Sequence, residues 1–359
     1  MNMSLSKFIK RFVIGFAIAF GIALVGGGGF LKVRYFHHKL PTKAVKLEDV
    51  KGVYILNMDR STDRRAVYEK MLREHFGNNF LGKNIGEEIR LQNIVDGKKE
   101  IIFENVETGQ KVNFQQTSKN GNKFIENGTW KVYTKKDPQV YFYVKMDETQ
   151  QKYAKEYLKM NEEQKKKNWY AGIINFEKGR LYSTSGNFLS FLHAFEKIAN
   201  QPDGTYGIVF EDDFFVDKNF YKKLQNALSE APENADLLKL SVSQLNYYKN
   251  KSKRIPRTRE NIKVMLNSFK KYGYGSYVKT AKFNTDFILS SVCYVVSKKG
   301  AQKILDWYKD KKSAHFAPIS DIQLNFFMAH NNPDFMSYQY INKVPVLLQD
   351  NAEQTTTLY

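Results

Sequence analysis

Three consecutive carboxylates follow an apolar segment that is typical of a buried strand. Glu211, Asp212 and Asp213 come directly after Tyr206-Gly-Ile-Val-Phe210. Adjacent acids repel one another, and Mn²⁺ or Mg²⁺ would offset this because such cations prefer carboxylate oxygens and bridge to phosphates. Alternation along an extended chain places Glu211 and Asp213 on one side and Asp212 on the other. The triplet is therefore a candidate metal site with Glu211 and Asp213 as ligands. The alternative is a solvated turn before the next helix.

A second polar segment follows another short apolar strand. Val53-Tyr-Ile-Leu56 ends in Asn57-Met-Asp-Arg-Ser61, and Ser61 is a good N-cap for the helix after it. The apolar side chains expected on one face of that helix are Val67, Met71, Leu72 and Phe76. Ligands of open α/β sheets bind at the carboxyl ends of the strands, so this loop is a candidate binding segment.

The remaining pattern predicts an α/β fold with an insertion. Strands alternate with helices, which indicates a mostly parallel sheet flanked by helices. The helix expected over 185–198 contains His193, which we interpret as a core or surface histidine. Residues 98–167 differ, because short β-branched and aromatic segments alternate there with turn dipeptides such as Asn127-Gly128 before a polar helix. We interpret them as a small inserted β-meander plus that helix.

The N-terminal region has the composition of a membrane segment. Residues 12–31 carry no charge, and twenty helical residues just cover a hydrocarbon core of about 30 Å. We expect a single-pass N-terminal transmembrane helix, with a cleaved signal peptide or a buried helix as alternatives. The predicted organisation is an anchor and linker over 1–40 and a catalytic domain over 41–359. Basic residues flank both ends of the segment, but the single cysteine favours the cytoplasmic side for the domain.

Positive charge is concentrated in one stretch. The chain has 56 Lys and Arg against 37 Asp and Glu, and residues 249–282 alone hold eleven basic residues and one acid. This basic loop is either a solvated surface segment or a lid that closes on an anionic substrate. Nucleic acid is not an expected partner, because no groove-reading motif is present. The lone Cys293 lies in an apolar strand and is expected to be buried and inert.

Four stretches together resemble glycosyltransferase family 25, the lipopolysaccharide galactosyltransferase-like group. The segments similar to that family's motifs are Val53-Tyr-Ile-Leu-Asn-Met-Asp-Arg-Ser-Thr-Asp-Arg-Arg65, Ile94-Val-Asp-Gly97, Ile208-Val-Phe-Glu-Asp-Asp213 and Cys293-Tyr-Val-Val-Ser-Lys-Lys-Gly-Ala301. Pro318-Ile-Ser-Asp321 lies close to a further motif. Where the family often has a Ser-His pair, this chain has Gly186-Asn187. The resemblance implies a GT-A-like fold.

The resemblance also implies a reaction and roles for particular residues. A UDP-sugar of galactose or another hexose would donate its sugar to a hydroxyl of a saccharide or glycolipid acceptor, with inversion at the anomeric carbon. The residues implied to contact the nucleotide sugar are Asn57, Arg60, Arg64, Asp96 and Asp212. Glu211 and Asp213 would hold Mn²⁺ or Mg²⁺ against the diphosphate. Asp321 is the first choice for the catalytic base and Asp286 the second.

Two other functions are compatible with the same residues. A metal-dependent nucleotidyl- or phosphotransferase could use the same acidic triplet but would not release UDP from a sugar donor. A non-enzymatic, membrane-anchored basic binding protein would bind anionic surfaces even without Glu211 and Asp213.

Overall fold

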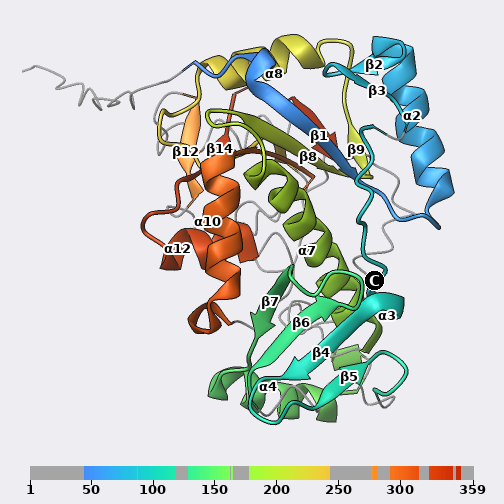
Figure 1. Ribbon diagram of the computed structural model, residues 1–359, viewed down its shortest axis with the longest axis vertical. Helices are drawn as coiled ribbons and strands as arrows, with labels where there is room; N and C mark the ends of the chain where they lie inside the picture. Colours follow the sequence, from blue (N-terminus) through green and yellow to red (C-terminus); the bar gives the residue numbers. More distant parts are fainter. Residues whose placement is uncertain are drawn as a thin grey trace, which may run out of the picture. The chain divides into compact units, whose positions relative to one another are not determined.

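A six-stranded mixed sheet forms the centre of the fold (Figure 1). The computed structural model describes residues 44–86, 88–117, 128–161, 163–164, 178–242, 276–280, 292–314, 323–342 and 345–348. In spatial order the strands are β1 (Val50–Leu56), β8 (Tyr206–Glu211), β13 (Cys293–Ser297), β10 (Leu237–Lys239), β14 (Ser337–Tyr340) and β12 (Tyr277–Lys279). β1, β8, β10 and β14 run in one direction, whereas β13 and β12 are antiparallel to their neighbours. The expectation of a mostly parallel sheet is wrong for those two strands, because hydropathy marks a strand without giving its direction.

Alternating side chains of the strands build a core on each face of the sheet. In β8, Ile208 and Phe210 belong to the apolar cluster on one face, and Val209 belongs to the cluster on the other. β13 divides in the same way, with Val295 on the first face and Tyr294 on the second. This period of two with both faces apolar is the pattern of a sheet covered by helices on both sides.

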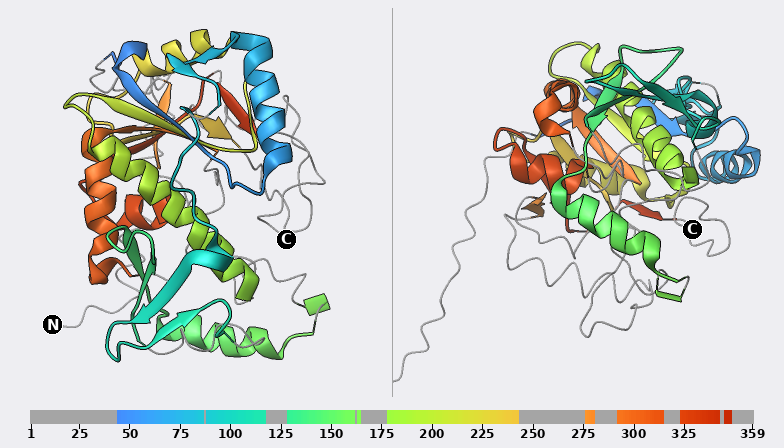
Figure 2. Two further views of the ribbon diagram at one scale, coloured as in Figure 1. Left: turned by 45° about the vertical axis from the view of Figure 1, so that its right-hand side comes forward. Right: turned by 90° about the horizontal axis from the view of Figure 1, so that it is seen from below.

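Helices cover both faces. The four long helices in contact with the sheet cores are α2 (Thr62–Phe76), α7 (Lys178–Ala199), α8 (Phe220–Ser229) and α10 (Lys298–Lys309). Figure 2 shows α7 and α10 side by side, where they pack against each other. α2 begins after Ser61 as predicted, but the Ser61 side chain makes no capping hydrogen bond. Leu72 is buried as predicted and Tyr68 is buried as well, whereas Val67 is exposed, so its predicted place on the apolar face is wrong.

The predicted insertion is a four-stranded antiparallel sheet. Its elements are β4 (Ile101–Asn105), β5 (Lys111–Asn113), β6 (Trp130–Thr134) and β7 (Tyr141–Val144), after the short α3 (Gly97–Glu100) and before α4 (Glu148–Lys159). The spatial order is β5-β4-β6-β7, so β5 pairs with β4 but not with β6 as it would in a simple meander. Phe142 meets Phe188 of α7 edge to face, with 5.0 Å between ring centroids. The inserted sheet therefore shares a core with the helix beneath the central sheet.

A smaller sheet is formed in part by strands that directly follow β8 and β10 in the sequence. It consists of β11 (Ser241–Val242), β15 (Val346–Leu348) and β9 (Phe214–Phe215). The remaining short elements are η1 (Leu47–Asp49), β2 (Asn79–Phe80), β3 (Lys83–Asn84), η5 (Lys311–Ser313), η6 (Gln323–Met328) and α12 (Ala329–Asn331).

Cys293 of β13 is buried, as its apolar strand predicts. Burial raises the pKa of its thiol well above the ordinary value.

Several predictions concern residues that the structure does not describe. The membrane segment 12–31, most of the basic loop 249–282, and the candidate bases Asp286 and Asp321 fall outside the described ranges. Among the described helices, none has both the length and the hydropathy needed to cross a bilayer.

Candidate active site

The carboxyl ends of β1 and β8 bring the two polar segments together. The strands are parallel neighbours, and Leu56 lies opposite Glu211 in their register. The residues that follow therefore leave the sheet side by side, and the Asn57 Nδ2 donates a 2.8 Å hydrogen bond to Oδ2 of Asp212. Both side chains are buried. The two strand ends that the sequence marks as binding segments thus form one site.

Asn57 is held on every side. Its Nδ2 also donates to the Ser61 carbonyl at 3.1 Å, and its Oδ1 accepts from Nε of Arg65 at 3.1 Å. The backbone carbonyl of Asn57 accepts from Nε of Arg90 at 3.2 Å. Asn57 therefore fixes the β1–α2 loop against the acidic triplet. The nucleotide contact that the resemblance implies for Asn57 stays a prediction beside this internal role.

Arg64 supplies positive charge beside the triplet. Its guanidinium donates from one terminal nitrogen to Oδ1 of Asp212 at 2.8 Å, and little of either side chain is exposed. Burial acts to lower the pKa of Arg64, but the charge and hydrogen bond of Asp212 and the charges of Asp213 and Glu211 leave that pKa raised. The acids therefore lie close enough to stabilise the cation. Part of the repulsion that suggested a metal is offset by Arg64.

Asp212 differs from its two neighbours in the triplet. Its two carboxylate oxygens accept from Asn57 and Arg64, so it acts as the anchor of the loop. Glu211 and Asp213 are half-buried, and Glu211 accepts a 3.3 Å hydrogen bond from Nδ2 of Asn187 on α7. Carboxylate oxygens are the donors that Mn²⁺ and Mg²⁺ prefer, so Glu211 and Asp213 fit the proposed metal by their chemistry.

Arg60 and Asp96 form an exposed pair at the rim of this site. The Arg60 NH1 lies 2.6 Å from Oδ2 of Asp96, and half of the Arg60 side chain is exposed. Asp96 is the N-cap of α3, where its other oxygen accepts from the Lys98 backbone at 3.2 Å. The pair joins two segments that both resemble family motifs. Its exposure leaves the guanidinium accessible to an anion in solution.

Arg90 is a site residue that the sequence did not single out. Residues 89–91 run beside β1, where the Ile55 amide donates to the Ile89 carbonyl at 2.6 Å. This places the Arg90 guanidinium against the carboxylate of Asp59. The hydrogen bond and the charge of Arg90 lower the pKa of Asp59. No local pattern marks residues 89–91 as an edge partner of β1, because a single bridge has no periodicity.

Close backbone packing fixes the segment that carries Asp96. A Cβ added to Gly186 of α7 would lie 2.8 Å from Cα of Gly97, and one added to Gly97 would lie 1.8 Å from the Tyr182 carbonyl oxygen. Ser190 Oγ donates to the Gly186 carbonyl at 2.8 Å and accepts from the Val95 amide at 3.0 Å. The glycine in the place of the family's Ser-His pair therefore allows α7 to touch residues 95–97.

Comparison with known proteins gives one family. Residues 50–322 match glycosyltransferase family 25 (LPS biosynthesis protein), a range that contains both strand ends and the Arg60–Asp96 pair. A search of curated proteins finds no match.

Proposed function

This chain belongs to glycosyltransferase family 25 and is a glycosyltransferase with a sugar donor and an acceptor; we propose that its donor is a UDP-sugar bound at the ends of β1 and β8. The observation that carries the proposal is the convergence of Asn57, Arg64 and the acidic triplet at one end of adjacent parallel strands. Strand ends of this kind are where α/β sheets bind nucleotides.

The proposed chemistry is a single displacement with inversion. A hydroxyl of a saccharide or glycolipid acceptor attacks the anomeric carbon of galactose or another hexose as the bond from that carbon to the diphosphate breaks. We assign the acceptor proton to Asp321, with Asp286 as the second choice, because a carboxylate base would strengthen the attacking hydroxyl. UDP leaves with the electron pair of the broken bond.

Residues of this chain would prepare the donor for that step. Glu211 and Asp213 would hold Mn²⁺ or Mg²⁺, which when bound stabilises the negative charge growing on the leaving diphosphate. Asn57 and Arg64 keep Asp212 in place, so the flanking carboxylates are fixed before the donor arrives. Arg60 would contact a donor phosphate, since its guanidinium is half exposed and its ion pair among the described residues is with Asp96.

We further propose that residues 12–31 anchor the enzyme to a membrane, with the catalytic domain on the cytoplasmic side and residues 249–282 facing an anionic acceptor. The uncharged stretch and the eleven basic residues of that loop support this.

A release assay tests the proposal. The full-length protein in detergent is incubated with a panel of nucleotide sugars, with and without Mn²⁺, and free UDP is measured. We expect release from one UDP-sugar that depends on Mn²⁺ and rises when an acceptor extract is added. Release of pyrophosphate or inorganic phosphate instead would contradict the assignment of reaction class.

A further inference from the structure

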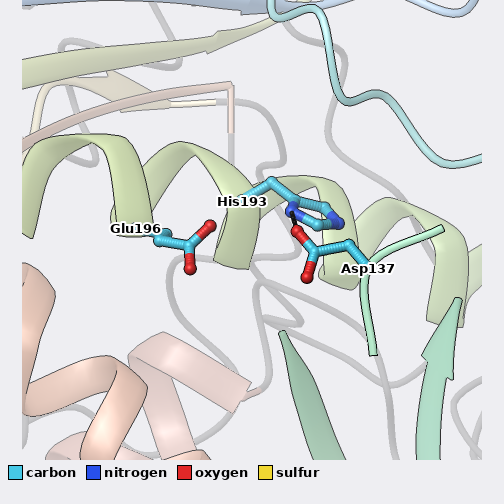
Figure 3. A group of neighbouring side chains, drawn as sticks. All are labelled: Asp137, His193 and Glu196. Atoms are coloured by element: carbon cyan, nitrogen blue, oxygen red, sulfur yellow. Dashed lines mark ion pairs between the residues drawn. The ribbon is translucent and has the colours of Figure 1, made fainter. Parts of the chain in front are cut away.

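A second group of metal-ligating side chains lies where α7 meets the β6–β7 connection (Figure 3). His193 and Glu196 are three residues apart on α7, so they share a face of that helix. Asp137 comes from the connection between β6 and β7. One ligand atom from each residue lies within 4.8 Å of the other two. His193 is six residues beyond Asn187, about 9 Å further along the helix axis, so the group is separate from the acidic triplet.

The His193 ring is buried, and one of its nitrogens lacks a hydrogen bond. Only 2% of the residue is exposed, and its Nδ1 is buried without a hydrogen bond. The nearest acid, Oδ2 of Asp137, is 3.5 Å from that nitrogen, which is longer than an ordinary N–H···O hydrogen bond. A buried imidazole nitrogen with no partner is destabilising, and native structures rarely leave one. Among the described residues, the Nδ1 of the ring therefore faces the Asp137 carboxylate without a hydrogen bond, which leaves this nitrogen available as a ligand atom.

The two acids are arranged around the same position. Oδ1 of Asp137 accepts from the Gln139 amide at 3.3 Å, and the Asp137 amide donates to Oγ1 of Thr134 at 3.1 Å. These bonds hold Asp137 so that Oδ2 faces His193. Burial, followed by the charge of Asp137, raises the pKa of Glu196, with Lys309 and Lys197 opposing.

We propose that Asp137, His193 and Glu196 form a binding site for Zn²⁺, separate from the catalytic metal, that fastens the inserted sheet to α7. One imidazole nitrogen and two carboxylate oxygens are a donor set that zinc accepts, with water in the fourth position. Bonds of about 2.0–2.2 Å put tetrahedral ligands about 3.5 Å apart, which the His193 and Asp137 atoms already satisfy. Rotation of the Glu196 side chain would bring its carboxylate oxygen from within 4.8 Å of the other two ligand atoms to the same spacing. The imidazole argues against Mg²⁺ and Ca²⁺, which prefer oxygen ligands.

Direct metal binding tests this proposal. Full-length protein in detergent is stripped with a chelator and titrated with Zn²⁺ in excess Mg²⁺, and the metal that remains after dialysis is measured by mass spectrometry. We expect one retained Zn²⁺ per chain in the wild type and in the double variant Glu211→Gln/Asp213→Asn. Cobalt in place of zinc should give the visible absorption of a four-coordinate site.

Conservative variants identify the ligands. His193→Gln, Asp137→Asn and Glu196→Gln should each weaken Zn²⁺ binding at least ~100-fold, whereas His75→Gln on the exposed part of α2 should not. Asp137 and Glu196 are only half-buried, so their variants keep the test valid if His193→Gln does not fold. Absence of a retained equivalent in the wild type would overturn the proposal. So would Zn²⁺ that is lost with the Glu211 and Asp213 substitutions but kept in the His193 and Glu196 variants.

Discussion

The side chain of Asn57 donates a 2.8 Å hydrogen bond to Asp212, although 155 residues separate them in the chain. The bond joins the ends of adjacent parallel strands and orders the loop that contains Glu211 and Asp213. Because Asp212 also accepts from Arg64, its charge is balanced inside the protein. The proposed donor site is therefore built on a buried polar network with a partly exposed rim.

Asn57→Ala should weaken both stability and turnover. The substitution removes one of the two donors of a buried carboxylate, which costs about 1–3 kcal/mol. Denaturant unfolding would measure the loss, and kcat for UDP release should fall because Asp212 no longer fixes the loop. The control Asn93→Ala changes an exposed side chain and should alter stability by less than about 0.5 kcal/mol. Equal effects in the two variants would contradict the role given to Asn57.

Arg64→Met should be more destabilising, because it leaves Asp212 without its ion-pair partner and removes a positive charge near Glu211 and Asp213. Breaking a buried ion pair by removal of one partner costs about 3–5 kcal/mol. If Glu211 and Asp213 bind a cation, Mn²⁺ should raise the thermal midpoint of Arg64→Met by more than that of the wild type. The difference should vanish when Asp213→Asn is added. A Mn²⁺ effect that survives Asp213→Asn would place the cation elsewhere.

Arg60→Ala should raise the KM for the nucleotide sugar with little change in unfolding free energy. The Arg60–Asp96 pair is half exposed, and such pairs contribute only about 0–1 kcal/mol to stability. The control is Arg73→Ala, which removes an exposed arginine side chain of the neighbouring α2. Steady-state kinetics with the donor varied would decide. An unchanged KM in Arg60→Ala would contradict the proposed contact between Arg60 and the donor.

Gly97→Ala should disrupt the contact between α7 and the Asp96 segment. Its Cβ would overlap the Tyr182 carbonyl, and such overpacking costs about 1–3 kcal/mol. Because Asp96 precedes Gly97, the donor KM should rise as well. The neighbouring Lys98→Ala is exposed and should leave the thermal midpoint nearly unchanged. A stable Gly97→Ala protein with normal KM would show that the close packing is not needed.

Sequence reasoning identified the local elements but not their partners. The strands at 53–56 and 206–210 and the turn-rich insertion follow from hydropathy and turn residues, and the structure confirms them. The adjacency of β1 and β8 does not follow from local pattern, so Asn57 could be placed at a strand end but not against Asp212. The antiparallel direction of β13 was missed for the same reason.

The roles of single side chains were harder to predict than the elements. His193 lies buried in the predicted helix, yet nothing local links it to Asp137, which is 56 residues earlier in the chain. Val67 fits an apolar helical face by spacing but is exposed, because the packing of Tyr68 and Leu72 sets the orientation of α2. Contacts between distant segments determine these positions.

The most direct test of the central claim is the rate of UDP release from the preferred donor by Asp213→Asn in saturating Mn²⁺. If Asp213 helps hold the cation at the diphosphate, kcat should fall at least ~100-fold while the unfolding transition is retained. The exposed Glu230→Gln serves as the matched acid-to-amide control and should keep wild-type turnover. Wild-type turnover by a folded Asp213→Asn protein would contradict the account.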